Sequence, residues 1–335
     1  MEFTYFIGTD VSKNELDFAL MQGKTFLFHK EIENKPEKIH AFVQELKKLA
    51  GFDLKTAVFC MEHTGIYNNP LLTYLHKKKV NVCLEAATQI KNSLGNLRGK
   101  NDKVDSMRIA EYAYKNRDEL RLWEPQREVL QRLAHLSVTR SRLLTAQKVL
   151  KMPLNESVGF VGKAIVKLTV QVCEMTIKAV ALDLKKVEEA IAEIISEDPE
   201  LNRLFGLVTS VTGIGAVTAT QIILTTNEFK DINDPKKYAC YAGVAPFTRE
   251  SGVMKGKSRV SHMANKTVKT LLHLAAMTAI QYNEDLKKFY ERKTMEEKKN
   301  KMSVLNAVRN KLIARIFACV NQNRKYDKTY VNSLA

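Results

Sequence analysis

The sequence predicts a chain of three parts: a mixed α/β domain over residues 1–120, a helical coiled-coil arm over 121–200 and a mainly α-helical C-terminal domain over 201–335. Three observations lead to this division. Short apolar runs alternate with amphipathic helical patterns in the first part, and two long helical patterns follow Pro125. Helical spacing resumes in the last part, apart from a loop with Gly and Ser that is expected at 243–262. A chain of 335 residues is also too long for one ordinary core.

The first part supplies the strands. Apolar runs end in acids at Asp10 and Glu62, and two further strands between 15 and 32 would be joined by a turn centred on Gly23. Helical spacing and one more strand pattern follow in alternation, with helices expected at 35–49, 69–79 and 102–116 and a strand at 80–85. Strands that alternate with helices predict a mixed sheet with helices on its faces.

The second part reads as two long helices. Residues 126–150 carry an apolar stripe, which Pro153 and the pair Gly159 and Gly162 are expected to interrupt. In 163–196 the apolar residues follow a near-heptad rhythm, through Ile165, Leu168, Val172, Met175, Ala179, Leu182, Val187, Ile191 and Ile194. Such helices form either a coiled-coil arm that mediates assembly or a plain two-helix packing layer, and both interpretations stay open.

Composition narrows the class of partner. The chain has 53 Lys and Arg against 37 Asp and Glu, a net charge of +16, which favours nucleic acid as the partner over a membrane surface. No apolar run approaches the roughly 20 residues that cross a bilayer, and the N-terminus lacks the features of a signal peptide. Five scattered cysteines are typical of a reducing compartment, so a cytoplasmic protein without membrane partners is expected.

Four acids form the first candidate site. Asp102 and Asp105 share one face of a helix start, where the plain interpretation is an N-cap followed by a favourable first-turn acid. The alternative is a metal site, because Asp10 and Glu62 end strands whose edges could meet beneath that helix. Carboxylates gathered this way repel one another unless cations neutralise them, and oxygen ligands suit Mg²⁺ or Mn²⁺. Two such ions stabilise the attacking and leaving oxygens of a phosphodiester displacement. An acid at the end of one strand, an acid at the end of another strand and then a pair of acids on a helix is the order found in ribonuclease H-like nucleases.

The segments "GTDVSKNELDFAL", "MEHTGIYNNPLLTYL" and "KNDKVDSMRIAEYA" resemble the three blocks of the DEDD transposase domain. That domain is similar to the Holliday-junction resolvase RuvC and occurs in a family of bacterial insertion-sequence transposases that includes the pilin-gene invertase Piv. The resemblance implies a RuvC-like, RNase H-like fold for 1–120, with Asp10, Glu62, Asp102 and Asp105 as catalytic metal ligands. It also implies a structured non-coding bridge RNA that pairs with target and donor DNA.

A second signature follows in "VTGIGAVTATQIIL" and "YACYAGVAPFTRESGVMKGKSRVSHMANKTVKTLLHLAAMTA", which are similar to the C-terminal domain of the same family. The resemblance implies that Ser251 is the nucleophile and forms a covalent phosphoserine link. The basic side chains near Ser251 would hold a phosphate group. These are Arg249, Lys255, Lys257 and Arg259. From the residues alone, Ser258 and Ser261 lie in the same basic stretch, and a phosphate-positioning hydroxyl is the plainer role for any of the three.

Two glycine motifs need separate treatment. "TGIGAVTA" is not a dinucleotide fingerprint, because Thr218 stands where the third glycine would be. It fits a helix–hairpin–helix in which the turn at Gly213 and Gly215 offers backbone N–H groups to a DNA phosphate, or a tight helix–helix turn without a ligand. "GVMKGKS" has one residue too few between Gly252 and Gly256 for a P-loop, so ATP binding is rejected.

The sequence therefore predicts a DNA transposase or site-specific recombinase that assembles as a dimer or tetramer. We expect the acids and Ser251 to act together, from two domains of one chain or from two subunits. An alternative is a RuvC-like, structure-specific nuclease that hydrolyses junctions with water. A third interpretation, an inactive nucleic-acid-binding relic, is disfavoured by the intact set of four acids.

Overall fold

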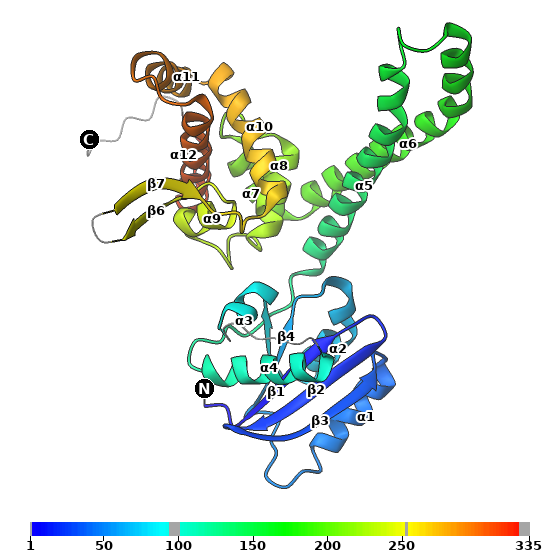
Figure 1. Ribbon diagram of the computed structural model, residues 1–335, viewed down its shortest axis with the longest axis vertical. Helices are drawn as coiled ribbons and strands as arrows, with labels where there is room; N and C mark the ends of the chain where they lie inside the picture. The colour runs from blue at the N-terminus through cyan, green and yellow to red at the C-terminus, as the bar shows by residue number, and fades with distance from the viewer. Residues whose placement is uncertain (1, 94–100, 252–253, 328–335) are drawn as a thin grey trace. The chain divides into compact units, whose positions relative to one another are not determined.

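A computed structural model describes residues 2–93, 101–251 and 254–327, and Figure 1 shows the course of the chain. The chain forms two compact units, Met1–Pro125 and Gln126–Ala335. The two long helices belong to the second of these units. A further division of that unit into an arm and a C-terminal domain stays a prediction from the sequence.

The first unit is built on a five-stranded sheet of order β3-β2-β1-β4-β5 (Figure 1). Its strands are β1 (Tyr5–Val11), β2 (Glu15–Gln22), β3 (Thr25–Glu33), β4 (Ala57–Glu62) and β5 (Asn81–Glu85). The first three form an antiparallel meander, and β4 and β5 run parallel to β1. The expected turn is present, and Gly23 adopts the left-handed φ of 54° that such a tight hairpin favours. The predicted mixed sheet is confirmed.

Alternation along the strands gives the sheet two apolar faces. One face packs against α1 (Pro36–Leu46) and α2 (Asn69–Lys77), which follows the short helix η1 (Gly65–Asn68). The other face packs against α4 (Asp102–Lys115) and α3 (Ala87–Ser93), a helix that the sequence patterns did not predict. Because β1 is the central strand, the residues near its C-terminal end lie between neighbouring strands and under α4.

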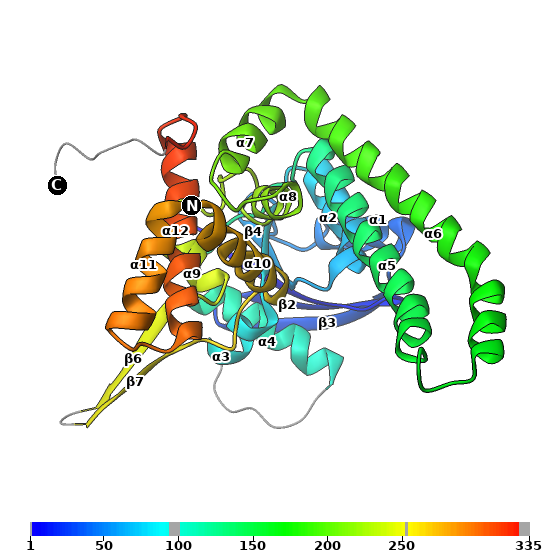
Figure 2. The same cartoon turned by 90° about the horizontal axis from the view of Figure 1, so that it is seen from above.

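The second unit begins with the antiparallel helices α5 (Glu128–Glu156) and α6 (Lys163–Glu197), which lie side by side in both views (Figures 1 and 2). The expected interruption lies at Gly159 and Gly162, between the two helices, but the expectation that Pro153 also interrupts the first helix was wrong. Pro153 lies inside α5, and its carbonyl accepts a hydrogen bond from Ser157 N–H at 3.0 Å. A proline near the end of a helix forfeits only one main-chain hydrogen bond, so the last turn can form around it.

The apolar residues of α6 divide into two stripes. The residues that are half-buried beside α5 are Val166, Cys173, Ile177, Val180, Leu184, Val187 and Ile191. The first six residues of the predicted near-heptad stripe, from Ile165 to Leu182, are instead exposed. The larger ones expose 55–77% of their surface, namely Ile165, Leu168, Val172, Met175 and Leu182. Packing against α5 therefore leaves a regular apolar stripe on α6 uncovered.

Helices dominate the rest of the second unit. They are α7 (Pro199–Thr209), α8 (Ala216–Thr225), α9 (Pro235–Tyr241), α10 (Lys266–Tyr282), α11 (Glu284–Glu291), the π-helical η2 (Arg292–Glu296) and α12 (Lys301–Asn321). The buried faces of α7, α8, α10 and α12 share one core with the base of α5 and α6. The expected helix–hairpin–helix corresponds to α7, the turn before α8, and α8 itself.

The loop expected at 243–262 is mostly an antiparallel hairpin of β6 (Pro246–Ser251) and β7 (Met254–Val260). The expectation was wrong because the hairpin is built from residues that carry no apolar alternation. Phe247, Ser258 and Arg259 are all exposed, so main-chain pairing rather than burial defines these strands. Figures 1 and 2 both show the hairpin extending away from the helices.

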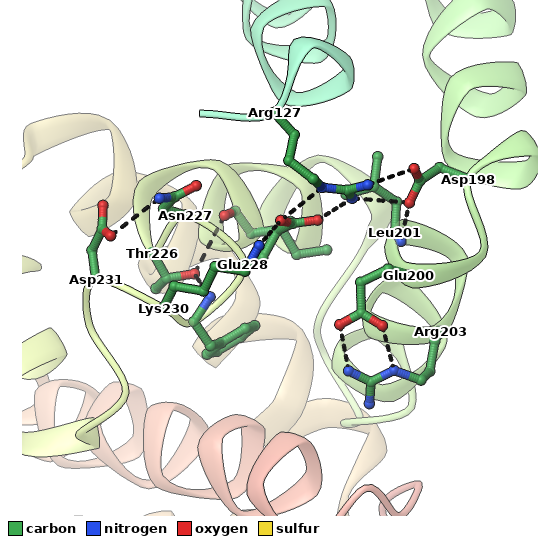
Figure 3. A network of polar contacts seen from close by, with 12 residues as sticks. Arg127, Asp198, Glu200, Leu201, Arg203, Thr226, Asn227, Glu228, Lys230 and Asp231 are labelled. Atoms are coloured by element: carbon green, nitrogen blue, oxygen red, sulfur yellow. Dashed lines mark hydrogen bonds and ion pairs between the residues drawn. The ribbon is translucent and has the colours of Figure 1, made fainter. Parts of the chain in front are cut away.

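A charge network around the buried side chain of Glu228 joins the start of α5 and the end of α6 to the loop after α8 (Figure 3). Arg127, the residue before α5, donates to both carboxylate oxygens of Asp198 at 2.8 and 3.0 Å and also to the carboxylate of Glu228. Lys230 pairs with Glu228 as well, at 2.8 Å. Asn227, Glu228 and Phe229 all have left-handed φ angles of 48–63°, so the network secures a strained turn.

Among the described residues, no helix is both long and apolar enough to cross a membrane.

Candidate metal centre and serine hairpin

Three of the predicted acids meet in the first unit. Asp10 lies near the end of β1, and Asp102 and Asp105 lie in the first turn of α4. Each offers one carboxylate oxygen, and these atoms lie within 4.8 Å of one another. Asp102 is exposed and the other two are half-buried, so the group opens to solvent on one side. The structure thus brings together the strand acid and the helix acids.

Gly8 is the residue that allows this approach. A Cβ atom at Gly8 would lie 2.1 Å from the Ser106 carbonyl oxygen and 2.2 Å from the Ala110 backbone nitrogen. The backbone of α4 therefore rests directly on β1, two residues before Asp10. This close packing holds the first turn of the helix over the end of the strand.

The plain interpretation of Asp102 as the N-cap was wrong. Asn101 is the cap, and its side-chain oxygen accepts from the Lys103 N–H at 3.0 Å. Because an amide does the capping, the Asp102 carboxylate is free to face the other acids. Asp105 is paired with Arg108, whose Nη1 lies 2.7 Å from its Oδ1.

Glu62 lies beside this group rather than within it. β4 is parallel to β1, with Thr9 paired to Met61, so Glu62 follows at the level of Asp10. Burial, followed by the charge of Asp105, raises the pKa of Glu62. Burial also raises the pKa of Asp10 to about 6, with further contributions from Asp102, Asp105 and Glu62. The four acids are therefore one electrostatic group, although only three lie within 4.8 Å of one another.

These residues fit a divalent cation. All the donors are carboxylate oxygens, the ligands that hard cations prefer. The raised pKa of Asp10 reports the mutual repulsion and burial that a bound cation would relieve. Arg108 compensates only part of this charge, through Asp105. The acidic group is thus suited to a divalent metal ion.

Two more acids extend the same level of the sheet and were not anticipated. Asp17 pairs across from Asp10, and Glu85 pairs across from Glu62. Asp17 is buried, with its Oδ1 2.7 Å from Nε2 of His29. The sequence did contain a signal for both acids in their positions along the strands. Glu85 ends the segment "VNVCLE" as Glu62 ends β4, and Asp17 lies two residues before Ala19, on the face of β2 that packs against α4.

The serine region lies on the hairpin of the second unit. Ser251 is the last residue of β6 and pairs with Met254 of β7. Arg249 lies in β6, and Lys255, Lys257 and Arg259 lie in β7. The side chains of Arg249, Ser251, Lys255 and Lys257 fall outside the described part of the structure. Their roles stay predictions.

The two alternative serines differ in their surroundings. Ser258 is exposed on β7, whereas the Ser261 hydroxyl oxygen accepts from the Met263 N–H at 3.0 Å. Ser261 therefore already serves a local turn after the hairpin.

The two glycines of the turn before α8 have different surroundings. Gly213 has a φ of 98°, and a Cβ there would lie 2.6 Å from the Ala275 carbonyl oxygen on α10. This glycine is required by packing. Gly215 precedes α8, is exposed, and has open space around it. Phosphate binding by this turn stays a prediction alongside the purely structural interpretation.

Two family models match the chain. A model described as a transposase, of the DEDD type of IS110, matches residues 7–156, which include the four acids. A second model, described as the transposase IS116/IS110/IS902 family, matches residues 206–291, which include the turn before α8 and the hairpin.

Individual relatives give the same result. The chain is 25% identical to the pilin gene-inverting proteins of Moraxella lacunata and Moraxella bovis, over 98% of this chain and 99% of each relative. It is 24% identical to an uncharacterized 43.6 kDa protein of insertion element IS110 from Streptomyces coelicolor, over 46% of this chain and 38% of that protein. Among solved structures, RuvC of T. thermophilus in complex with a Holliday junction substrate matches 36% of this chain and 99% of that chain, with a TM-score of 0.28 and 13% identity.

Proposed function

We propose that this chain, which matches models of the IS116/IS110/IS902 transposase family over residues 7–156 and 206–291, is a transposase of that family and recombines DNA with a four-carboxylate metal site and a serine nucleophile. One observation carries the proposal: the carboxylate oxygens of Asp10, Asp102 and Asp105 lie within 4.8 Å of one another. Carboxylates this close together repel one another unless a cation binds between them. The net charge of +16 favours an anionic substrate.

The proposed metal ligands are Asp10, Glu62, Asp102 and Asp105, and the proposed ion is Mg²⁺ or Mn²⁺. Such an ion, when bound, supplies positive charge where a phosphodiester displacement develops negative charge. The first unit would then be an RNase H-like domain of the RuvC type. Its strand order, with acids at the ends of two neighbouring parallel strands, supports that assignment.

Ser251 is the proposed nucleophile. Its hydroxyl loses a proton, its oxygen bonds to the phosphorus of one DNA linkage, and the bridging oxygen of the broken linkage leaves and takes up a proton. The phosphoserine link conserves the energy of the phosphodiester, so strands can rejoin without ATP. A serine hydroxyl needs activation at neutral pH. The acidic site is the proposed source, acting from the same chain or from another subunit.

A homo-oligomer, dimer or tetramer, is part of the proposal. The exposed stripe of α6 repeats with a spacing of three and four residues, from Ile165 through Leu168, Val172, Met175 and Ala179 to Leu182. A stripe with that repeat is the seam of a coiled coil. Pairing of two such helices from different subunits would cover it.

The proposed partners are donor and target DNA and a structured guide RNA. The net charge of +16 supports nucleic acid in general. The RNA rests on the family resemblance of the two sequence signatures alone. Enzyme-bound RNA would be found by purifying the protein with its element transcript and sequencing what remains bound after a high-salt wash.

The test of the mechanism uses Ser251→Ala with Ser258→Ala as the matched control on the same hairpin. On supercoiled donor and target DNA, the wild type and the control should form a covalent protein–DNA adduct that survives denaturing electrophoresis, and Ser251→Ala should form none. Asp10→Asn should abolish the adduct as well. Cleavage that persists in Ser251→Ala would mean hydrolysis by water, the chemistry of a junction nuclease, and would refute the serine step.

A further inference from the structure

The root of the hairpin is held between two helices. Gly243, which has a φ of 64°, has no room for a side chain, because a Cβ there would lie 2.3 Å from Cβ of Ala264. The same position lies 3.6 Å from Nζ of Lys269 on α10. On the other side, Nδ2 of Asn306 on α12 donates to the Val244 carbonyl oxygen at 2.7 Å. β6 begins two residues later.

A buried arginine lies beside this root without an acid to neutralise it. Arg309 on α12 is 6% exposed. Its Nη2 donates to Nδ1 of His273 at 2.7 Å, its Nη1 approaches Oδ1 of Asn306 at 3.5 Å, and its Nε has no partner. In the parts of the chain that the structure describes, no carboxylate pairs with this guanidinium. A guanidinium stays protonated in proteins, so the fold carries an uncompensated buried charge.

The arginine also determines which nitrogen of His273 can donate. Because Nδ1 accepts from Arg309, the neutral ring carries its proton on Nε2. Burial, and then the positive charge of Arg309, lower the pKa of His273, which keeps the ring in this neutral form. Lys269 precedes His273 by four residues on α10, so the two side chains lie on the same face of the helix.

We propose that Lys269, His273 and Arg309 form a binding site for one backbone phosphate of double-stranded DNA. The ammonium of Lys269 and the Nε2–H of His273 would contact the phosphate oxygens. Arg309, buried on the Nδ1 side of the His273 ring, would add positive charge without touching the phosphate. The site rests on the proposed function, since that function makes DNA the partner. It lies at the base of β6, about 17 Å of extended chain from Ser251 at the far end. Its role is to position the duplex, not to take part in strand transfer.

The first test measures the binding of a fluorescent DNA duplex by anisotropy over a range of salt concentrations. Lys269→Gln should weaken binding about tenfold and lower the slope of log affinity against log salt by about 1, the value for one lost phosphate contact. His273→Gln should weaken binding with no change of slope, because the ring is neutral. The control is Lys287→Gln, which removes the same charge from an exposed position on α11 and should leave the slope unchanged.

The outcomes separate the site from the proposed function. If the wild type binds with a steep salt dependence but Lys269→Gln behaves as Lys287→Gln does, the site is refuted and the function stands. If the wild type shows no salt-dependent binding to DNA, the proposed function fails first, and the site fails with it.

The second test distinguishes a ligand site from a structural arginine. In Arg309→Met an apolar side chain of similar length replaces the unpaired charge, so the melting temperature of the DNA-free protein should rise while DNA affinity falls. A melting temperature below that of the wild type would show that Arg309 serves folding, and it would overturn the part assigned to this residue.

Discussion

At the scale of single residues, Asp10 is a proposed metal ligand whose ionisation lowers the stability of the metal-free fold. Its pKa is raised from 3.8 to about 6, first by burial and then by the neighbouring acids. A carboxyl with a raised pKa favours the folded state while it is protonated. It costs stability as the pH rises from 3.8 through about 6.

We therefore expect Asp10→Asn to raise the melting temperature of the metal-free protein at pH 7 and to leave it nearly unchanged at pH 4. Glu119→Gln, an exposed position in the same unit, is the control and should have little effect at either pH. Divalent cation should stabilise the wild type and leave Asp10→Asn almost unaffected. Thermal melts at the two pH values, with and without Mn²⁺, test this. An Asn variant less stable than the wild type at pH 7 would contradict it.

Gly8 is the residue on which the geometry of the site depends most directly. The β-carbon of Gly8→Ala would lie 2.1 Å from a backbone oxygen of α4, and neither backbone can yield cheaply. We expect a loss of roughly 3 kcal/mol in the free energy of unfolding and a loss of the response to Mn²⁺. Gly206→Ala is the matched control, because nothing lies within 4 Å of a Cβ there. Denaturant titration of both variants measures the difference, and equal stabilities would refute the close-packing argument.

At this scale the sequence predicted much of the acidic site but not its details. Acids that follow apolar runs were sufficient to predict Asp10 and Glu62, because strand ends of a parallel pair share an edge. The capping residue was misassigned, since Asn101 and Asp102 are both good N-caps and only the backbone decides between them. Arg309 carries no sequence signal at all, because an arginine on an amphipathic basic helix is expected to be exposed.

At the scale of elements, Arg127 fixes the start of α5 to the end of α6 and to the loop after α8. This residue binds the start of α7 through Asp198 and the loop after α8 through Glu228, whose side chain is fully buried. Burial tends to raise the pKa of Glu228, but hydrogen bonds from Arg127 and Lys230 hold it below its ordinary 4.5. The hydrogen bond from Arg127 is also the main cause of the lowered pKa of Asp198.

We expect Arg127→Gln to cost about 2–3 kcal/mol at pH 7, because it leaves the Glu228 carboxylate buried with only Lys230 as a partner. A carboxyl whose pKa is lowered in the folded state stabilises the fold at pH values above its ordinary pKa. This contribution is lost as the pH falls through the lowered pKa. The difference between variant and wild type should therefore shrink below about pH 4. Arg203→Gln, which removes an exposed pair with Glu200, should cost well under 1 kcal/mol. A difference independent of pH would contradict the assignment.

The exposed stripe of α6 gives the second prediction for an element. Replacing Leu168 and Met175 with Lys should lower the oligomeric mass measured by light scattering, since both side chains are more than half exposed in the single chain. The same change at Thr169 and Thr176, one position further along the helix, is the control. If the oligomer survives the first double substitution, the interface lies elsewhere.

The elements themselves were predicted unevenly, for physical reasons. The long helices and the sheet strands have strong periodicity because each buries one face. The β6–β7 hairpin has almost none, since its strands bury little and are defined by main-chain pairing. The α6 stripe was predicted, but the first six of its nine residues are exposed, because periodicity indicates an apolar face and not what covers it.

At the scale of the whole molecule, charge and core are divided unequally. The first 125 residues are almost neutral, and nearly all of the net charge of +16 lies after them. The first unit has two apolar clusters of its own, one on each face of its sheet. The acidic group of Asp10, Asp102 and Asp105 thus lies in the nearly neutral unit, and most of the positive charge lies in the other.

We expect residues 1–125 alone to unfold cooperatively and to bind Mn²⁺, yet to bind DNA only weakly, because the fragment lacks the positive charge. Calorimetry of the fragment and an anisotropy titration beside the full chain test both statements. A fragment that binds DNA as tightly as the full chain would refute the inference that the positive charge after residue 125 provides the affinity for DNA.

The cap of α4 has a consequence for the history of such a gene. Because Asn101 caps the helix, Asp102 is not needed as the capping residue. A copy that lost this acid would keep its fold, and a copy that lost Asp10 would be more robust than its parent. If these acids hold the proposed metal ion, mutations at either position would inactivate the protein without unfolding it, and silent copies would persist as well-folded proteins.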